Sequence, residues 1–291
     1  MQAETLISLN IKHYTDGDFV IESAFRYHFY LSIAKHKISC VIADPLNVKV
    51  VSLKTFSNQN VDFFDINYED WKNFDEILEE LKPAYKSKFV LIDNEDCLIA
   101  PESLCNIIEL EAYYQLHKPI LENSQMSYCK LHIFNTSAVF NLRNETIKFI
   151  RFEMPTADLL HQSQLFIKAI AKSQIEEKDK KIFVNVHEQF IEVLATDGQN
   201  LQFYNTFKYD TETDFVYYIL SVADLLGMES NQIQIMLFGD ITNTDTAFEM
   251  LKKYAARVQF GDKLQQFYYP TAFNQFSSHQ HFVLSSCLLC E

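Results

Sequence analysis

The residues best suited to metal chemistry gather near the end of the chain, where two histidines precede two cysteines: His279, His281, Cys287 and Cys290. A His-x-His pair on a strand presents both imidazoles on one face, and a Cys-x-x-Cys pair on a turn can hold one Zn²⁺. The cysteine pair is flanked by apolar residues, has no neighbouring glycine or proline, and has no second pair elsewhere. Two interpretations stay open: a zinc-stabilised C-terminal domain, and a chain end packed into the core with its cysteines as small apolar groups. We favour the second.

Glycine is too scarce to build the loops that hold phosphates or an acyl-transfer nucleophile. The 291 residues include 5 glycines, and no two of them lie closer than twelve positions. This supply excludes the motifs G-x-G-x-x-G, GxxxxGK[ST] and G-x-S-x-G. The histidines are scattered, and spacing alone does not define a Ser-His-Asp or Cys-His set. We therefore assign no catalytic residue and expect no cofactor.

The chain is acidic, with 25 basic and 39 acidic side chains, a formal net charge of −14 and an isoelectric point near 5.1. A field of this sign repels phosphates, and no cluster of lysine and arginine offsets it, so we expect no nucleic-acid partner. The acidic stretch from Asp62 to Glu80 has two interpretations. It is either a solvated helix face or a docking face for a basic partner.

The sequence also bears on the compartment. No apolar run approaches the ~20 residues of a membrane-spanning helix. The first ten residues have no basic region, and their apolar stretch is too short for a secretion signal. The six cysteines are therefore expected to be reduced. We predict a cytoplasmic protein without a membrane span, and the sequence leaves its oligomeric state open.

The elements that position these residues follow a similar order in both halves of the chain. Apolar spacing in the first half predicts strands between Tyr30 and Leu53, a helix over 69–81, a strand over 89–92, a helix from 102 to about 116, strands over 131–134 and 147–152, and a helix from Pro155 to about 172. In the second half it predicts strands over 184–186, 190–195 and 201–204, a helix from about 213 to 226 closed by Gly227, a strand over 233–238 and a helix from about 245 to 254. The charge run over 176–181 is the predicted boundary between the halves.

An internal duplication would explain this shared order. Residues 31–52 align with residues 184–205 without gaps, at an offset of 153 positions, with three identities and apolar residues at matching places. We predict two duplicated α/β lobes, 1–175 and 182–291. The alternative is two unrelated α/β halves.

Two lobes that each begin with three antiparallel strands and continue into alternating helices and parallel strands resemble the actin-like ATPase fold. Several segments are similar to a bacterial family of uncharacterised domains with that fold: Ala100–Leu104, Phe183–Val186, Leu201–Phe207, Asp214–Leu220, Leu237–Gly239 and Leu289–Glu291. The resemblance covers nearly the whole chain, and the block from Asn205 to Leu220 is its most distinctive part. It implies an α/β fold of two actin-like (ribonuclease-H-like) lobes, but no activity, because none is established for that family.

The resemblance also implies where a nucleotide would lie. Actin-like ATPases carry a D-x-G turn in each lobe, in which the glycine admits the phosphates and the aspartate organises Mg²⁺. Ser32 and Ala34 take these places in the first lobe, and Asn185 and His187 take them in the second. Gly239 either matches part of the loop beneath the adenosine or marks a turn. Because carboxylates and glycines are missing, these five positions are predicted to form a vestigial nucleotide cleft that does not hydrolyse ATP.

These inferences lead to one functional prediction and two alternatives. We predict a non-catalytic actin-like protein that binds another macromolecule, most simply a protein of unknown identity, or presents a scaffold. The first alternative is a nucleotide-binding actin-like protein with altered phosphate contacts. The second is the zinc-stabilised C-terminal domain considered above.

Overall fold

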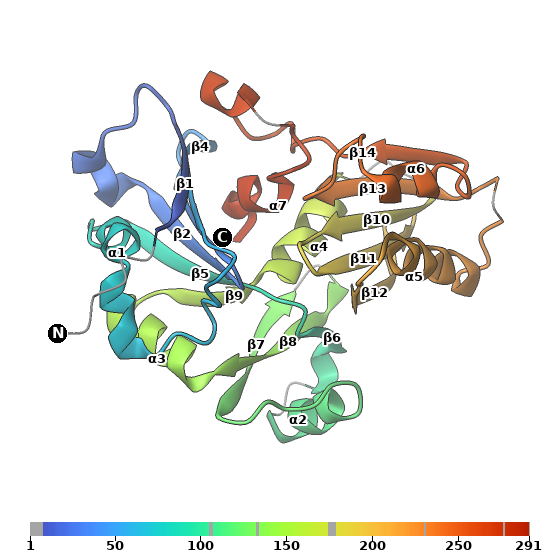
Figure 1. The fold of residues 1–291 in the computed structure, drawn as a ribbon, viewed down its shortest axis with the longest axis horizontal. Coiled ribbons are helices and arrows are strands. Elements are labelled where there is room, and N and C mark those ends of the chain that lie inside the picture. The colour runs from blue at the N-terminus through green and yellow to red at the C-terminus, as the bar shows by residue number, and fades with distance from the viewer. Residues whose placement is uncertain are drawn as a thin grey trace.

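Two mixed β-sheets, one in each half of the chain, form the framework of the molecule (Figure 1). The computed structural model describes residues 8–104, 107–131, 134–173, 179–229, 231–275 and 277–290. Segments 31–53 and 184–207, which the duplication relates, lie in different sheets. The predicted α/β class with two lobes is therefore confirmed.

The sheet of the first lobe has six strands in the order β1-β4-β3-β2-β5-β9. Its strands are β1 (Asn10–Thr15), β2 (His28–Ala34), β3 (Lys37–Asp44), β4 (Lys49–Ser57), β5 (Ser87–Asp93) and β9 (Asp158–His161). Strands β2, β3 and β4 form an antiparallel meander, and β5 and β9 run parallel to β2. Because β2 and β5 lie in the interior of the sheet, their central residues are mostly apolar and buried.

The sheet of the second lobe repeats this arrangement with five strands in the order β12-β11-β10-β13-β14. Its strands are β10 (Lys180–Val186), β11 (Phe190–Asp197), β12 (Asn200–Lys208), β13 (Gln234–Gly239) and β14 (Arg257–Phe260). Strands β10 to β12 form the antiparallel meander, and β13 and β14 continue in parallel.

The two meanders agree in register as well as in order. Strand β3 begins at Lys37 and β11 begins at Phe190, so the offset of 153 found in the sequence holds between them. Each meander has an irregularity between its second and third strands, after Ile42 in the first lobe and after Ala195 in the second. These positions also differ by 153, and such bulges are features that related folds keep.

A small third sheet is inserted in the first lobe between β5 and β9. It consists of β6 (Cys97–Pro101), β7 (Ser124–Leu131) and β8 (Thr136–Arg143), in the order β6-β8-β7. Helix α2 (Ile107–Gln115) packs against β6, and Tyr114 is fully buried in the core of the insertion. The insertion explains why the first half of the chain is longer than the second.

Helices cover both faces of the two large sheets. Helix α4 (Gln162–Ser173) lies between the lobes with the short α7 (Phe282–Ser285) packed against it (Figure 1). Helices α1 (Asp75–Leu81) and α3 (Asn144–Glu153) belong to the first lobe, and α5 (Glu212–Leu225) and α6 (Thr246–Leu251) to the second. The chain end returns to the first lobe, since Phe273, Phe282 and Cys287 are buried in the same core as its strands.

Local signals explain the ends of helix α5. The Thr211 side chain accepts from the backbone N–H of Asp214, whose carboxylate accepts from the backbone N–H of Thr211, which forms a capping box. At the other end Gly227 has a φ of 63°, the left-handed conformation predicted for a glycine that closes a helix. Among the described residues, no helix is long and apolar enough to cross a membrane.

One predicted element of the first half is wrong, and another begins later than expected. Residues 132 and 133 of the strand predicted over 131–134 lie outside the described residues. Residues 147–152 are not a strand but part of helix α3, in which Ile147, Phe149 and Ile150 are buried while Phe152 is 67% exposed. The helix predicted from Pro155 begins only at Gln162, because the short strand β9 precedes it. In both places a short apolar run fits either period, and tertiary packing decides the outcome.

Candidate functional site

The residues of the predicted nucleotide cleft lie at the facing ends of the central strands of the two lobes. Ser32 is buried within β2, and Ala34 ends that strand. Asn185 is buried near the end of β10, and His187 follows the strand directly. Gly239 ends β13 beside Val186. The carboxyl ends of parallel strands are where α/β folds bind ligands, so the location suits a site.

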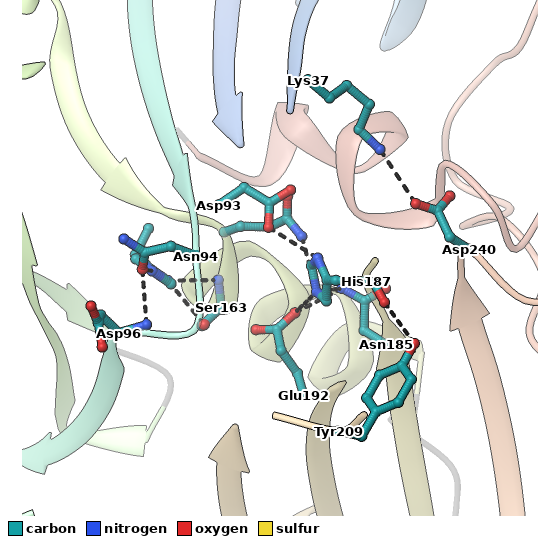
Figure 2. A network of polar contacts seen from close by, with 12 residues as sticks. Lys37, Asp93, Asn94, Asp96, Ser163, Asn185, His187, Glu192, Tyr209 and Asp240 are labelled. Atoms are coloured by element: carbon teal, nitrogen blue, oxygen red, sulfur yellow. Dashed lines mark hydrogen bonds and ion pairs between the residues drawn. The ribbon is translucent and has the colours of Figure 1, made fainter. Parts of the chain in front are cut away.

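The side chain of His187 crosses from the second lobe toward the first and lies between two carboxylates (Figure 2). Its Nδ1 is 3.0 Å from Oδ1 of Asp93, at the end of β5, and its Nε2 is 3.0 Å from Oε2 of Glu192 in β11. The contact with Asp93 is an ion pair between the lobes, while Glu192 belongs to the same lobe as His187. The ring also stacks on Phe190, with centroids 4.0 Å apart.

Burial and charge together fix the protonation of this triad. The three side chains are at most 11% exposed. Burial alone lowers the pKa of His187, but the charge of Asp93 and the contacts with Glu192 outweigh it and raise that pKa. Burial alone raises the pKa of Glu192, but the hydrogen bond and charge of His187 lower it. The triad therefore holds an imidazolium between two carboxylates.

A chain of neutral groups continues from Glu192 back to the first lobe. The Tyr204 hydroxyl donates to Oε1 of Glu192 at 2.7 Å and also contacts the Ser163 hydroxyl. The backbone N–H of Ser163 donates to Nδ1 of His161 at 3.2 Å, and Nε2 of His161 donates to Oδ1 of Asn94 at 3.1 Å. Burial lowers the pKa of His161 to about 4, so this imidazole is neutral.

These contacts close a ring, because Asn94 follows Asp93 in the chain. The ring comprises Asp93, His187, Glu192, Tyr204, Ser163, His161 and Asn94. It joins the ends of β5 and β9, the start of α4, the turn after β10, and strands β11 and β12. We call it the interlobe ring. A buried polar network of this kind favours one arrangement of the elements that supply it.

Asn185 supports the ring from within the second lobe. Its Nδ2 donates to Oε2 of Glu192 at 2.7 Å. The Tyr209 hydroxyl donates to the backbone carbonyl of His187 at 2.9 Å and fixes the turn that carries the imidazole. Asn185 thus holds a carboxylate in place instead of supplying one.

Other polar contacts between the lobes lie nearer the surface, and two of them are weak. Nζ of Lys37 lies 3.5 Å from Oδ2 of Asp240, and both side chains are partly exposed. Nζ of Lys35 donates to Oε1 of Gln189 at 3.4 Å. Lys35 lies in the turn between β2 and β3 and reaches Gln189 in the corresponding turn of the second lobe, while Lys37 begins β3.

Gly239 has a conformation and a close contact that require glycine. Its φ is +82°, and a Cβ placed on it would lie 2.2 Å from the backbone oxygen of Val186 and 2.8 Å from Oδ1 of Asn185. A side chain would therefore separate β13 from β10 at the end where the lobes meet. This is the geometry of a turn with close backbone approach.

The candidate metal ligands near the chain end are occupied by other contacts. Nε2 of the buried His279 lies 2.7 Å from the carbonyl oxygen of Ile241, and its ring stacks on Phe260. Burial lowers the pKa of His281 to about 4, and Cys287 is fully buried in the core. The Cys290 side chain lies outside the described residues. Within the described part of the chain, no three or more His, Cys, Asp or Glu side chains are arranged so that they could hold a metal ion.

Sequence reasoning found the turns of this site but missed most of its charged residues. Asp93 ends an apolar strand, and Glu192 stands alone among apolar residues in Phe190–Ala195. An isolated carboxylate in a buried strand is the one signal that could have marked them, because buried charges need partners. Their partner in the other lobe could not be named from local sequence.

A pair of lobes with mixed sheets of this topology, joined at the ends of their central strands, defines the actin-like fold. The chain is similar to a protein of unknown function from Bacteroides thetaiotaomicron VPI-5482 that has an actin-like ATPase fold, with a TM-score of 0.79, 18% identity, and coverage of 94% of this chain and 100% of that one. It is also similar to a chain of a PilM–PilN type IV pilus biogenesis complex, with a TM-score of 0.55, 11% identity, and coverage of 90% and 98%.

The family follows from the sequence match. Residues 16–258 match the family described as "Protein of unknown function (DUF3822)", and the chain belongs to this family. The comparison with curated proteins gives no match. The predicted resemblance to an uncharacterised family with an actin-like fold is thus confirmed.

Proposed function

We propose that this protein is a non-catalytic actin-like binding or scaffold protein in which the interlobe ring takes the place of a bound nucleotide. The observation that carries the proposal is the position of His187. Its imidazolium lies where the glycine of the second-lobe phosphate turn would be, and it is ion-paired with Asp93 across the lobes. A fixed cation on the protein supplies the positive charge that a metal ion would otherwise bring.

The surrounding residues support this proposal. Ser32 and Asn185 offer no carboxylate to Mg²⁺, which prefers negatively charged oxygen ligands. Asp93 and Glu192 are carboxylates, but both already contact His187. A Cβ at Ala34 and the imidazole at His187 occupy the space that a phosphate-binding backbone needs.

One specific observation favours the nucleotide-binding alternative. The structure places two carboxylates, Asp93 and Glu192, at the predicted cleft, and carboxylates near a phosphate site are suited to Mg²⁺. To serve a nucleotide, they would have to release His187. The alternative therefore predicts that ATP–Mg²⁺ binding is coupled to loss of the ion pair with His187.

The decisive experiment is calorimetry with ATP–Mg²⁺ together with a phosphate-release assay. We expect neither binding nor turnover in the native protein, and none in Asn185→Asp, because His187 still blocks the phosphate path. Asn200→Asp, at the exposed start of β12 and at the opposite end of the second sheet from the cleft, serves as the matched control. Turnover above background that disappears in Asn185→Ala or Ser32→Ala would contradict the proposal and support the alternative.

We further propose that residues 1–175 and 182–291 are the two lobes of a duplicated unit, as the common register of their meanders suggests.

A protein partner is part of the proposal. A structural relative by fold is a chain of a PilM–PilN type IV pilus biogenesis complex, and we propose assembly of a comparable kind here. Four cysteines, Cys40, Cys97, Cys129 and Cys287, are buried and not joined in disulfides, which suits the cytoplasm that we propose as the compartment.

A further inference from the structure

A polar groove lies at the junction of the inserted sheet and the first lobe, away from the interlobe ring. It has a volume of about 790 Å³, which is within the range of ligand-binding clefts. Three parts of the chain form its walls: the loop before residue 68, the ends of β7 and β8, and the first two turns of α3. Figure 1 shows α3 beside the inserted sheet.

Side-chain amides are prominent in the lining. They come from Asn67, Asn123, Gln125 and Asn144. Oδ1 of Asn144 is buried, and within the described structure it has no hydrogen-bond partner. A carboxamide both donates and accepts, as a peptide group does, so such a lining can pair with the N–H and C=O groups of a bound backbone. An orphaned acceptor is a group that a bound donor would satisfy.

The charges in the groove do not favour an anion or a cation. The lining holds three basic side chains, Arg143, Lys148 and Arg151, and three acidic ones, Asp65, Glu122 and Glu145. Arg143 pairs with Asp65 at 2.7 Å, and Lys148 pairs with Glu145. The lining is therefore formally neutral, which disfavours a phosphate ligand and suits an uncharged polar backbone.

Two further features adjoin residues of the groove lining. Gln125 belongs to β7, and within the described part of the chain no strand pairs with the outer edge of β7, which can accept an added strand. Beside the lining residues Asn67 and Arg151, the rings of Tyr68 and Phe152 pack with centroids 5.0 Å apart. Phe152 is 67% exposed and offers an apolar surface.

We infer that this groove binds an extended peptide segment of a partner protein. The segment pairs its backbone with the edge of β7 and with the amide-bearing side chains, and it places an apolar side chain against Phe152. This inference rests on the proposed binding function and specifies its partner. Strand addition supplies affinity through main-chain hydrogen bonds, and the aromatic contact supplies selectivity.

The test is a selection from a phage-displayed library of random linear peptides on the full chain. Enriched peptides are synthesised and titrated by fluorescence anisotropy. Phe152→Ala removes the apolar contact, and Gln125→Trp fills the groove beside β7. The matched controls are Tyr254→Ala, an aromatic residue 52% exposed in the second lobe, and Gln202→Trp, at an exposed position of the edge strand β12.

The inference predicts peptides with at least one apolar residue whose dissociation constants rise about tenfold or more in Phe152→Ala and Gln125→Trp. The two control variants should change affinity less than about twofold, as expected for residues outside a binding hot spot. Failure to enrich any peptide, or equal binding to all four variants, would overturn the inference. Neither result bears on ATP binding, which calorimetry measures separately. The peptide-binding inference and the proposed loss of nucleotide binding can therefore fail independently.

Discussion

Replacing His187 with alanine removes a cation that lies between two buried carboxylates. Glu192 is 2% exposed and Asp93 is 9% exposed, so neither charge can be solvated by water without opening the structure. Loss of one partner from a buried ion pair costs about 3–5 kcal/mol, because the remaining charge stays unpaired. We expect the free energy of unfolding of His187→Ala to fall by about this amount.

Urea denaturation measures this loss, and a matched ion pair provides the control. Lys37 and Asp240 also join the lobes, but their side chains are 37% and 53% exposed, so Lys37→Ala should cost less than about 1 kcal/mol. Adding Glu192→Gln to His187→Ala should restore part of the loss, because it removes an unpaired charge. Equal losses for the two single variants, or a further loss on adding Glu192→Gln, would refute the reasoning.

The ion pair between His187 and Glu192 predicts that the stability of the protein depends on pH. The pKa of His187 is about 10 in the folded protein, above its ordinary value of 6.5. The stabilisation that protonated His187 contributes is therefore complete below pH 6.5 and is lost as the pH rises toward 10. The pKa of Glu192 is about 2 in the folded protein, below its ordinary value of 4.5. The stabilisation that ionised Glu192 contributes is therefore complete above pH 4.5 and is lost as the pH falls toward 2. The stability difference between the native protein and His187→Ala should therefore be smaller at about pH 9 than at about pH 6.

Two further predictions concern other parts of the chain. Gly239→Ala should destabilise the protein by more than ~1 kcal/mol in urea denaturation, because the added Cβ meets the Val186 carbonyl at a positive φ. Gly17→Ala should not destabilise the protein, because a Cβ at Gly17 meets no atom within 4 Å. Equal losses of stability in the two variants would contradict this prediction. Metal analysis of the purified protein should find less than about one tenth equivalent of zinc, because a single Cys-x-x-Cys is a weak site. Stoichiometric zinc that is lost in Cys287→Ser or His281→Ala would reverse this prediction.

The sequence was sufficient to predict the central elements of both lobes. Ile38 and Ile191 lie at matching places in β3 and β11, as the ungapped alignment predicted. This succeeded because each meander is a local structure, with strands joined by short turns whose residues are adjacent in the chain. Gly227 likewise acts within its own helix end, so its role could be predicted from position.

Nonlocal contacts set the limit of prediction. The segment 147–152 alternates apolar and basic residues in part, which suits a strand, but Trp71 stacks on Phe149 with centroids 3.8 Å apart and favours the helix. The interlobe ring depends in the same way on a contact between Asp93 and His187, which are far apart in sequence. Local patterns carry no information about which distant strand end will face another.

The return of the chain end to the first lobe has a consequence for synthesis on the ribosome. The core of the first lobe includes Phe273, Phe282, Val283 and Cys287, which are made after the whole second sheet. Domains usually fold from the N-terminus as they emerge. Here the second sheet can assemble around its own separate core first, while the core of the first lobe is completed only by residues made after that sheet. The order of completion is then the reverse of the order of translation.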